Sequence, residues 1–422
     1  MARRIVVVGG GTGGTLAANR LRRVVGPEVE IVVTDVDDRH LYQPGLLFVP
    51  FGLAPPGRLV RSRRAQLADG IELRLVAVDQ VDLSTDEVVL ADGERLGYDV
   101  LVVASGSRLL PEETEGLTGP GWGSRVHTFY SLPGAAALAG ALAGFDEGRL
   151  VVNLVDLPIK CPVAPLELCF LADWVLRRRG VRSRVELRYV TSLDGAFTRA
   201  TCNRALSGLL AEKGVEVVTE FATGEVDGAK GRLVSFDGRE VGFDLAVVVP
   251  VHGGAELVTR SAGLGDALGF VPTGPTLQAK AKENVFVIGD ATDLPASKAG
   301  SVAHFEGEVL VHNVQRFLAG EPPEARFDGH ANCFIETGFH KALLIDFNDE
   351  LDPVPGHFPW HVGLPLLEES RLNHLGKLAF EQLYWHAILP GRDIPLVGAD
   401  MPRAGKRAGA SDWRPRQQGG GR

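Results

Sequence analysis

The sequence predicts an α/β protein with two Rossmann-like domains, each a parallel sheet covered by helices. Three observations predict this class. A short apolar strand at 5–8 runs into a glycine-rich turn and a helix, and a second series of strands alternates with helices between about 150 and 250. A further apolar strand with a long helix after it lies near 285–318. Alternation of strands and helices is typical of parallel sheets with helices on their faces.

The first strand, Ile5 to Val8, is followed by a turn that contains five glycines and by a helix predicted from Thr15 to Arg23. Gly9, Gly11 and Gly14 have the spacing GxGxxG. Such a turn lets backbone amides approach a pyrophosphate at a helix N-terminus. A glycine-rich turn without a ligand is the alternative.

The next predicted strand, Val29 to Thr34, ends at Asp35, which lies 21 residues after Gly14. A carboxylate at this place accepts hydrogen bonds from a ribose hydroxyl. The order of strand, glycines, helix, strand and acid therefore predicts a dinucleotide site. The motif alone does not distinguish FAD from NAD.

Two further segments favour FAD. After the strand at 98–103, Ala104-Ser105-Gly106-Ser107 resembles the "ATG" segment of flavoproteins with two dinucleotide folds. Far downstream, Asn284 to Ala291 looks like the second FAD signature of that superfamily, in which the acid, here Asp290 after Gly289, binds the ribityl or phosphate end of the flavin. The helix predicted from Ser297 to Leu318 would point its N-terminus at the isoalloxazine. The FAD domain is therefore expected to be discontinuous.

In the middle of the chain, a thiol occupies the turn where a second nucleotide loop would lie. A buried strand is predicted from Leu150 to Val155 and a helix from Pro165 to Arg179, with Cys161 between them. This turn has no glycine, so a tight NADH site is disfavoured there. Lys160 and the helix N-terminus supply positive potential, which favours the thiolate of Cys161.

Composition excludes several other classes of protein. The net charge of -9 and the lack of a basic stripe argue against nucleic-acid binding. The first strand begins too early for a signal peptide, which predicts a cytoplasmic protein. The sequence has no apolar window of about 18 residues, so a transmembrane helix is not predicted. The four cysteines lack Cys-x-x-Cys spacing, so no metal site is predicted.

These motifs resemble the sulfide:quinone oxidoreductase family over about residues 1–400. In that family one cysteine follows the first strand of the second domain, with a glutamate six residues later, which here correspond to Cys161 and Glu167. A second cysteine follows the second FAD segment and corresponds to Cys333. The resemblance implies that hydrosulfide attacks a disulfide between the two cysteines, that Glu167 accepts a proton, and that two electrons reach FAD.

The sequence also departs from the family. A third cysteine that many members carry is missing from the stretch around 127–131, so a thioether to FAD is not expected. Histidines that some members place near the sulfide entry are missing around 194–197. Cys169 lies on an apolar helix face and is read as core packing, whereas Cys202 is not placed. A buried cysteine is often only a small apolar residue, and this alternative applies to Cys161 and Cys333 as well.

The region after Cys333 is predicted to contact a membrane and a quinone. A helix with apolar residues at Leu372, Leu375, Leu378, Ala379, Leu383 and Ile388 is predicted over 372–389, broken at Gly376. Its apolar face either packs on its own domain or serves as a monotopic anchor, with Trp360 and Trp385 at the headgroups. The resemblance favours the anchor, on the cytoplasmic side of a membrane.

Four residues are candidates for contact with the quinone and the flavin. Lys377 and Phe380 resemble the lysine and phenylalanine of the family's quinone pocket. Lys298 could hydrogen-bond to the flavin, and His304 could provide a proton route to the quinone. For each, a solvated or core role is the alternative.

The predicted organisation has five parts: FAD domain 1–110, second Rossmann-like domain 111–280, FAD domain 281–325, quinone and membrane region 326–402, and disordered tail 403–422. We predict that the protein is a sulfide:quinone oxidoreductase and that it can form a homo-oligomer. A type II NADH dehydrogenase-like quinone reductase and a flavin-binding subunit that docks a sulfur carrier are the alternatives.

Overall fold

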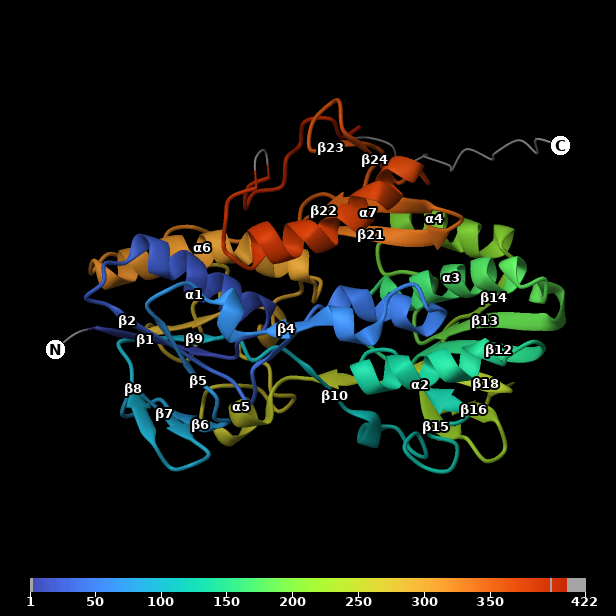
Figure 1. Ribbon diagram of the computed structural model, residues 1–422, viewed down its shortest axis with the longest axis horizontal. Coiled ribbons are helices and arrows are strands. Elements are labelled where there is room, and N and C mark those ends of the chain that lie inside the picture. Colours follow the sequence, from blue (N-terminus) through green and yellow to red (C-terminus); the bar gives the residue numbers. More distant parts are fainter. Residues whose placement is uncertain (1–2, 395–396, 408–422) are drawn as a thin grey trace.

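The computed structural model describes residues 3–394 and 397–407, and Figure 1 shows two halves with the C-terminal portion lying across both. The first half is built on a five-stranded parallel sheet in the order β20-β9-β1-β2-β5. Its strands are β1 (Arg4–Val8), β2 (Glu30–Thr34), β5 (Ile71–Arg74), β9 (Val100–Val103) and β20 (Val285–Val287). Helices α1 (Thr12–Val24) and α6 (Gly300–Leu318) pack together against it.

The second half repeats this design. Its parallel sheet has the order β11-β18-β12-β13-β14. The strands are β11 (Val126–His127), β12 (Gly148–Leu154), β13 (Val185–Thr191), β14 (Val215–Val218) and β18 (Leu245–Val249). The helices of this half are α2 (Leu132–Ala143), α3 (Ala164–Arg178) and α4 (Ala200–Glu212). Two Rossmann-like sheets therefore confirm the predicted fold class.

Each parallel sheet is accompanied by a three-stranded antiparallel sheet. The first comprises β6 (Val78–Asp82), β7 (Glu87–Leu90) and β8 (Arg95–Gly97), and the second β15 (Thr223–Asp227), β16 (Arg232–Ser235) and β17 (Glu240–Gly242). Shorter elements are β3 (Arg39–Leu41), β4 (Val60–Ser62), β10 (Arg108–Leu109), β19 (His252–Gly253), α5 (Glu256–Arg260), β23 (Gly356–Phe358) and β24 (Leu364–Leu366).

The central strands read as continuous apolar runs because both faces of each sheet are covered. In β1, Val6 pairs with Val32 on one side and Leu101 on the other. In β12, Val152 pairs with Tyr189 and Val247. All of these side chains are buried. The apolar stretch that begins at Ile71 forms two strands, β5 in the parallel sheet and β6 in the antiparallel one.

The C-terminal portion is a hairpin of β21 (Ala331–Gly338) and β22 (Lys341–Phe347) covered by α7 (Arg371–Leu383), and it lies above both halves in Figure 1. The Ser370 hydroxyl caps α7 by accepting from the amide of Asn373 at 3.0 Å. The predicted break at Gly376 is absent. A side chain there would approach the ring of Phe334 to 2.9 Å, so the glycine allows close packing instead. A π-helical turn, Tyr384–Ile388, extends the helix.

The exposed face of α7 is apolar. Leu372, Leu375, Leu378 and Leu383 are each more than one third exposed, as are Trp360 and Val362 in the loop between β23 and β24. These four leucines therefore do not pack on their own domain, whereas Ile388, the last residue of the predicted apolar face, is buried. Trp385 does not belong to this surface because it is buried, with the Arg61 guanidinium 4.2 Å from its ring centre.

The predicted disordered tail begins too early. Within it, residues 403–407 are placed, and the ammonium of Lys406 lies 2.5 Å from Asp346 in the interior. Residues 408–422 lie outside the described part of the chain. The domain boundaries at 110, 280 and 325 stay predictions.

Candidate active site

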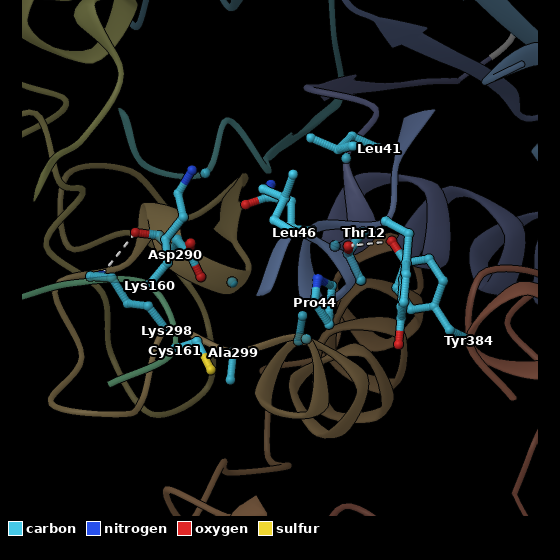
Figure 2. Close-up of a pocket in the computed structure, with 18 of the residues that line it drawn as sticks. Thr12, Leu41, Pro44, Leu46, Lys160, Cys161, Asp290, Lys298, Ala299 and Tyr384 are labelled. Carbon is cyan, nitrogen blue, oxygen red and sulfur yellow. Dashed lines mark hydrogen bonds between the residues drawn. The ribbon is translucent and has the colours of Figure 1, made fainter. Parts of the chain in front are cut away.

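A cavity of about 390 Å³ begins at the glycine-rich turn of the first half and ends between α3, β21 and α7. Figure 2 shows Cys161 beside Ala299, with Lys160, Lys298 and Asp290 on one side and Thr12 and Tyr384 on the other. Both halves and the C-terminal portion thus contribute to one site.

The glycines of the first turn have separate roles. Gly9 has a positive φ of 96°, and a side chain there would meet the carbonyl of Ala104 at 2.5 Å. A Cβ at Gly14 would lie 1.8 Å from the Gly9 carbonyl, so this glycine permits contact between helix and strand. Gly11 lines the cavity with open space where a side chain would stand. Of the three glycines, Gly11 is therefore the one whose missing side chain leaves room for a ligand, whereas Gly9 and Gly14 permit close packing.

Asp35 lies at the end of β2, as predicted, and lines the cavity. Its carboxylate accepts from the amide of Gly10 at 2.7 Å and pairs with Arg63 at 2.8 Å. The Arg63 guanidinium also donates to the carbonyl of Gly10. The sequence analysis missed Arg63, which no motif distinguishes from the neighbouring arginines. These bonds fix the acid at the edge of the turn.

The two further FAD segments, at 104–107 and 284–291, contribute residues to the same cavity as the glycine-rich turn. Ala104, Gly106, Gly289 and Asp290 all line the cavity, and Ser107 donates to the Asp290 carboxylate at 3.1 Å. The amide of Gly289 donates to buried Glu306 at 2.5 Å. Burial raises the pKa of Glu306 to about 8. Glu306 was not predicted, because a lone acid within an apolar helix carries no motif.

The residues present fit FAD. The open space at Gly11 is a cradle for a pyrophosphate, and the Asp35 carboxylate can accept hydrogen bonds from ribose hydroxyls. The hydroxyl of Ser105, which also lines the cavity, is buried without a partner among the described residues. A buried hydroxyl without a protein partner indicates a ligand atom within reach.

The turn after β12 holds Cys161 in the left-handed region, with φ at 46°. Its amide donates to the carbonyl of Lys298 at 2.8 Å, and its carbonyl accepts from Ala164 at 2.9 Å. Tyr130 also donates to that carbonyl, at 3.3 Å. Because Lys298 precedes α6, the bond from the Cys161 amide to its carbonyl attaches the turn that holds Cys161 to the FAD half.

Cys333 lies in β21, opposite Ile345 of β22, and lines the same cavity as Cys161. Both are free thiols in this structure. The pKa of Cys333 is raised by burial first and by the nearby Cys161 and Glu167 next. The structure thus brings together the two cysteines that the resemblance singled out. Cys169 is buried, as predicted, and Cys202 is also buried, near enough to Cys333 to add to that shift.

The expectation that Cys161 is a thiolate is wrong for the structure described. Burial raises the pKa of Cys161 to about 12, and the Glu167 carboxylate adds to this, while Lys377 opposes it. The adjacent Lys160 lines the cavity, and burial lowers the pKa of its own ammonium. Loss of water around the sulfur outweighs the helix N-terminus.

Glu167 is buried on the first turn of α3, where its carboxylate binds the ammonium of Lys377 and accepts from the amide of Glu336 at 2.6 Å. Burial raises the pKa of Glu167, an effect that Lys377 partly offsets. Burial acts to lower the pKa of Lys377, but Glu167 more than compensates and raises it. The two predicted residues therefore form one buried pair beside the thiols.

Phe380 and Lys377 both line the cavity. Lys298 also lines it, but its ammonium already donates to the carbonyls of Asp290 at 2.9 Å and Thr292 at 3.1 Å.

His304 does not fit its predicted role. It is buried outside the lining of the cavity, beside Arg20, and burial lowers its pKa to about 3. It remains neutral and has no contact with the quinone candidates, because it lies on the face of α6 that meets α1.

One network in the site was missed altogether. The hydroxyl of Tyr384 lies 2.7 Å from both Thr12 and His40, and joins the C-terminal portion to the glycine-rich turn. Burial lowers the pKa of His40 to about 4, so the imidazole is neutral. Separations of 344 and 372 residues leave no sequence signal for such contacts.

Comparison with known proteins agrees with this geometry. Residues 3–132 match the family model of pyridine nucleotide-disulphide oxidoreductases. The chain is 26% identical to mitochondrial sulfide:quinone oxidoreductase of Mus musculus and 27% identical to that of Dictyostelium discoideum, and each alignment covers 92% of this chain and 86% of the relative. The X-ray structure of sulfide:quinone oxidoreductase from Aquifex aeolicus has a TM-score of 0.78 at 19% identity, covering 93% of this chain and 92% of that one.

Proposed function

Since the chain belongs to the sulfide:quinone oxidoreductase family and is a FAD-dependent oxidoreductase, we propose that it oxidises sulfide at Cys161 and Cys333 and passes two electrons through FAD to a membrane quinone. One observation carries this proposal. Two cysteines from distant segments line the same cavity as both FAD segments. A pair of core cysteines would have no reason to share that surface.

The thiols supply the sulfur chemistry. Hydrosulfide attacks one sulfur of the oxidised Cys161–Cys333 pair, so that a new sulfur–sulfur bond forms and the old one breaks. One cysteine becomes a persulfide and the other leaves as a thiolate. Loss of two electrons and the persulfide proton then joins the thiolate and the persulfide through the added sulfur, and FAD, when bound, would accept these electrons and pass them to the quinone. Residues at the two FAD segments, Gly9, Gly11, Asp35, Ala104, Gly106, Gly289 and Asp290, would hold it.

The raised thiol pKa gives Glu167 a defined task. A buried thiol at pH 7 is protonated, and the thiolate that leaves during attack needs charge stabilisation. Lys377 acts to lower the pKa of Cys161, and Glu167, which binds Lys377, would accept the proton. Lys377 and Phe380 would contact the quinone head, where an ammonium stabilises the reduced oxygen.

Peripheral contact with a membrane is supported by the exposed leucines of α7. No helix in the described part of the chain is both long enough and apolar enough to cross a bilayer. The face of Leu372, Leu375, Leu378 and Leu383, with Trp360 and Val362 beside it, suits shallow insertion into the headgroup region. We expect the double variant Leu375→Ser/Leu378→Ser to bind quinone-containing vesicles several-fold more weakly, measured by co-sedimentation. Equal binding would contradict the anchor.

Anaerobic titration of the FAD-loaded protein with sulfide tests the function. We expect sulfide to bleach the flavin and a short-chain quinone to restore its absorbance. NADH at low concentration should leave the flavin oxidised. Cys161→Ser and Cys333→Ser should abolish bleaching while the flavin stays bound. Bleaching by NADH but not by sulfide would favour the NADH dehydrogenase-like alternative. Parental transfer in both variants would exclude the disulfide mechanism. The oligomeric state, and the cytoplasmic side, stay predictions.

A further inference from the structure

A carboxylate–imidazole pair continues from the Glu167–Lys377 pair toward the surface. Glu336 of β21 is buried, and the Nδ1 atom of His374 on α7 lies 2.9 and 3.0 Å from its two carboxylate oxygens. The side chain of Glu336 is 2% exposed, whereas that of His374 is 16% exposed. The imidazole is therefore the most exposed of the four side chains, since that of Lys377 is 12% exposed and that of Glu167 is 2% exposed.

The inner end of this line touches the proposed redox machinery. The amide of Glu336 donates to Glu167, and Lys377 donates to the carbonyl of Phe334 at 3.0 Å, two residues earlier in the same strand. The carboxylate of Glu336 acts on both partners, since it contributes to the raised pKa of Glu167 and of Lys377. His374 and Lys377 lie three residues apart on α7 and so share one side of the helix.

Several other titratable groups lie near His374. The ring of His340, in the turn between β21 and β22, lies 5.5 Å from that of His374 and is exposed. Glu336 faces it from β21, Lys377 lies on its own helix, and Glu167 lies beyond Glu336 on α3. Two buried carboxylates face one ammonium here, and His374 is the further nitrogen base in contact with them. An imidazole can accept a proton at one ring nitrogen and release one from the other.

Quinone reduction requires a proton source at this place. Hydrosulfide and quinone give sulfane sulfur held by cysteine and quinol, and the balance HS⁻ + Q + H⁺ → S⁰ + QH₂ takes one proton from solvent per turnover. We propose that His374 and Glu336 form the uptake route for that proton, from the surface to the Lys377–Glu167 pair. This inference rests on the proposed function. His374 takes the role in proton delivery that the sequence analysis gave to His304.

The quinone half-reaction tests the route without using sulfide. The FAD-loaded protein is reduced with dithionite, mixed with a short-chain quinone, and followed by flavin absorbance. We expect His374→Gln, which cannot carry a proton, to be reoxidised about 10- to 100-fold more slowly at pH 7 than the parental protein. Glu336→Gln should behave alike. Added imidazole should restore much of the rate to His374→Gln, and reduction of the flavin by sulfide should change less than about twofold.

An exposed histidine–glutamate pair provides a control. His312 on α6 lies 3.2 Å from Glu324, neither residue lines the cavity, and His312→Gln should retain the parental rate. Flavin content and thermal unfolding show whether each variant folds. Reoxidation of His374→Gln at the parental rate, with the parental solvent isotope effect, would overturn the route. Slow reoxidation that imidazole does not relieve would also overturn it, because a purely structural role predicts that result.

The two proposals fail in different ways. A parental protein whose flavin is reduced by dithionite and reoxidised by quinone, but is never reduced by sulfide, would overturn the proposed sulfide oxidation. The comparison of His374→Gln with His312→Gln would still decide the route. A dithionite-reduced parental protein that passes no electrons to quinone would overturn both.

Discussion

The turn at Gly9–Gly14 and the turn at 156–164 occupy equivalent places in the two halves. Each follows the central strand of a five-stranded parallel sheet, β1 in one and β12 in the other, and each leads into a helix. In the first turn a positive φ falls on Gly9, and backbone amides face the cavity. In the second the positive φ falls on Cys161, and a thiol faces it.

The difference shows how one position supports two chemistries. The carboxyl end of a central parallel strand is where open α/β sheets bind ligands. Removing side chains there exposes amides to an anion, whereas keeping one side chain presents a single reactive atom. In this protein the two turns face the same cavity, so the cofactor site and the sulfur site adjoin.

The largest expected effect separates the two turns by activity. Cys161→Ala should lower sulfide-dependent quinone reduction about 1,000-fold or more, because it removes one sulfur of the disulfide that hydrosulfide attacks, while flavin content stays at the parental level. Steady-state turnover and the flavin-to-protein absorbance ratio measure both quantities. Cys169→Ala, in the same helix region but buried in the core, is the control and should keep its activity. Loss of flavin in Cys161→Ala would mean that the two turns are not independent.

The second prediction makes the opposite change in the first turn. Gly14→Ala places a Cβ 1.8 Å from the Gly9 carbonyl, so α1 must move away from β1. We expect a loss of about 3 kcal/mol in the free energy of unfolding and little bound flavin, measured by chemical denaturation and absorbance. Gly140→Ala, at an exposed site in α2 with nothing within 4 Å, should instead stabilise by about 0.5–1 kcal/mol. Similar behaviour of the two variants would contradict the packing role of Gly14.

The third prediction concerns the acid six residues after the thiol. Glu167→Gln keeps the shape of the side chain but removes the base and the charge that Lys377 binds. Flavin reduction by sulfide should slow about 10- to 100-fold, as expected for loss of general-base assistance. Stopped-flow absorbance measures the rate. A rate within twofold of that of the parental protein would show that Glu167 does not act as the base beside the Cys161 thiol.

The last prediction tests the protonation state of the Cys161 thiol, with an effect of about tenfold for each pH unit. With a pKa near 12, Cys161 is mostly protonated at neutral pH. Its ionised fraction, and hence its alkylation rate in the reduced protein, should rise about tenfold per pH unit from pH 8 to pH 11. Mass spectrometry of the Cys161 peptide after brief iodoacetamide treatment measures this. A plateau below pH 9 would show that the helix N-terminus outweighs burial after all.

Much of the fold could be predicted because its signals are local. The glycine spacing, the acid at Asp35 and the apolar central strands each depend on a few adjacent residues. Cys161 was found in the same way, by its position in a βα turn. Cys333 was reached only through the resemblance to a family, since nothing around it marks a site.

The remainder depends on contacts between distant segments. Glu336 and His374 are 38 residues apart, and Tyr384 and Thr12 are 372 apart, so their pairing appears only in the folded chain. The error at Cys161 has a related cause. A charge beside the thiol is visible in the sequence, but the burial that outweighs it is not. For His304, helical spacing could not show that its side chain faces α1.

Helix α7 alone separates the exposed leucine face from the cavity that Lys377 lines. The exposed leucines and Lys377 lie on opposite sides of a rod that is about 10 Å across. A substrate dissolved in hydrocarbon would therefore travel only about that far to reach the ammonium, and its isoprenoid tail could remain in the bilayer during turnover. On this view the rate of exchange depends on how the lipid packs around one helix, so acyl-chain composition would affect turnover even when the quinone headgroup is unchanged.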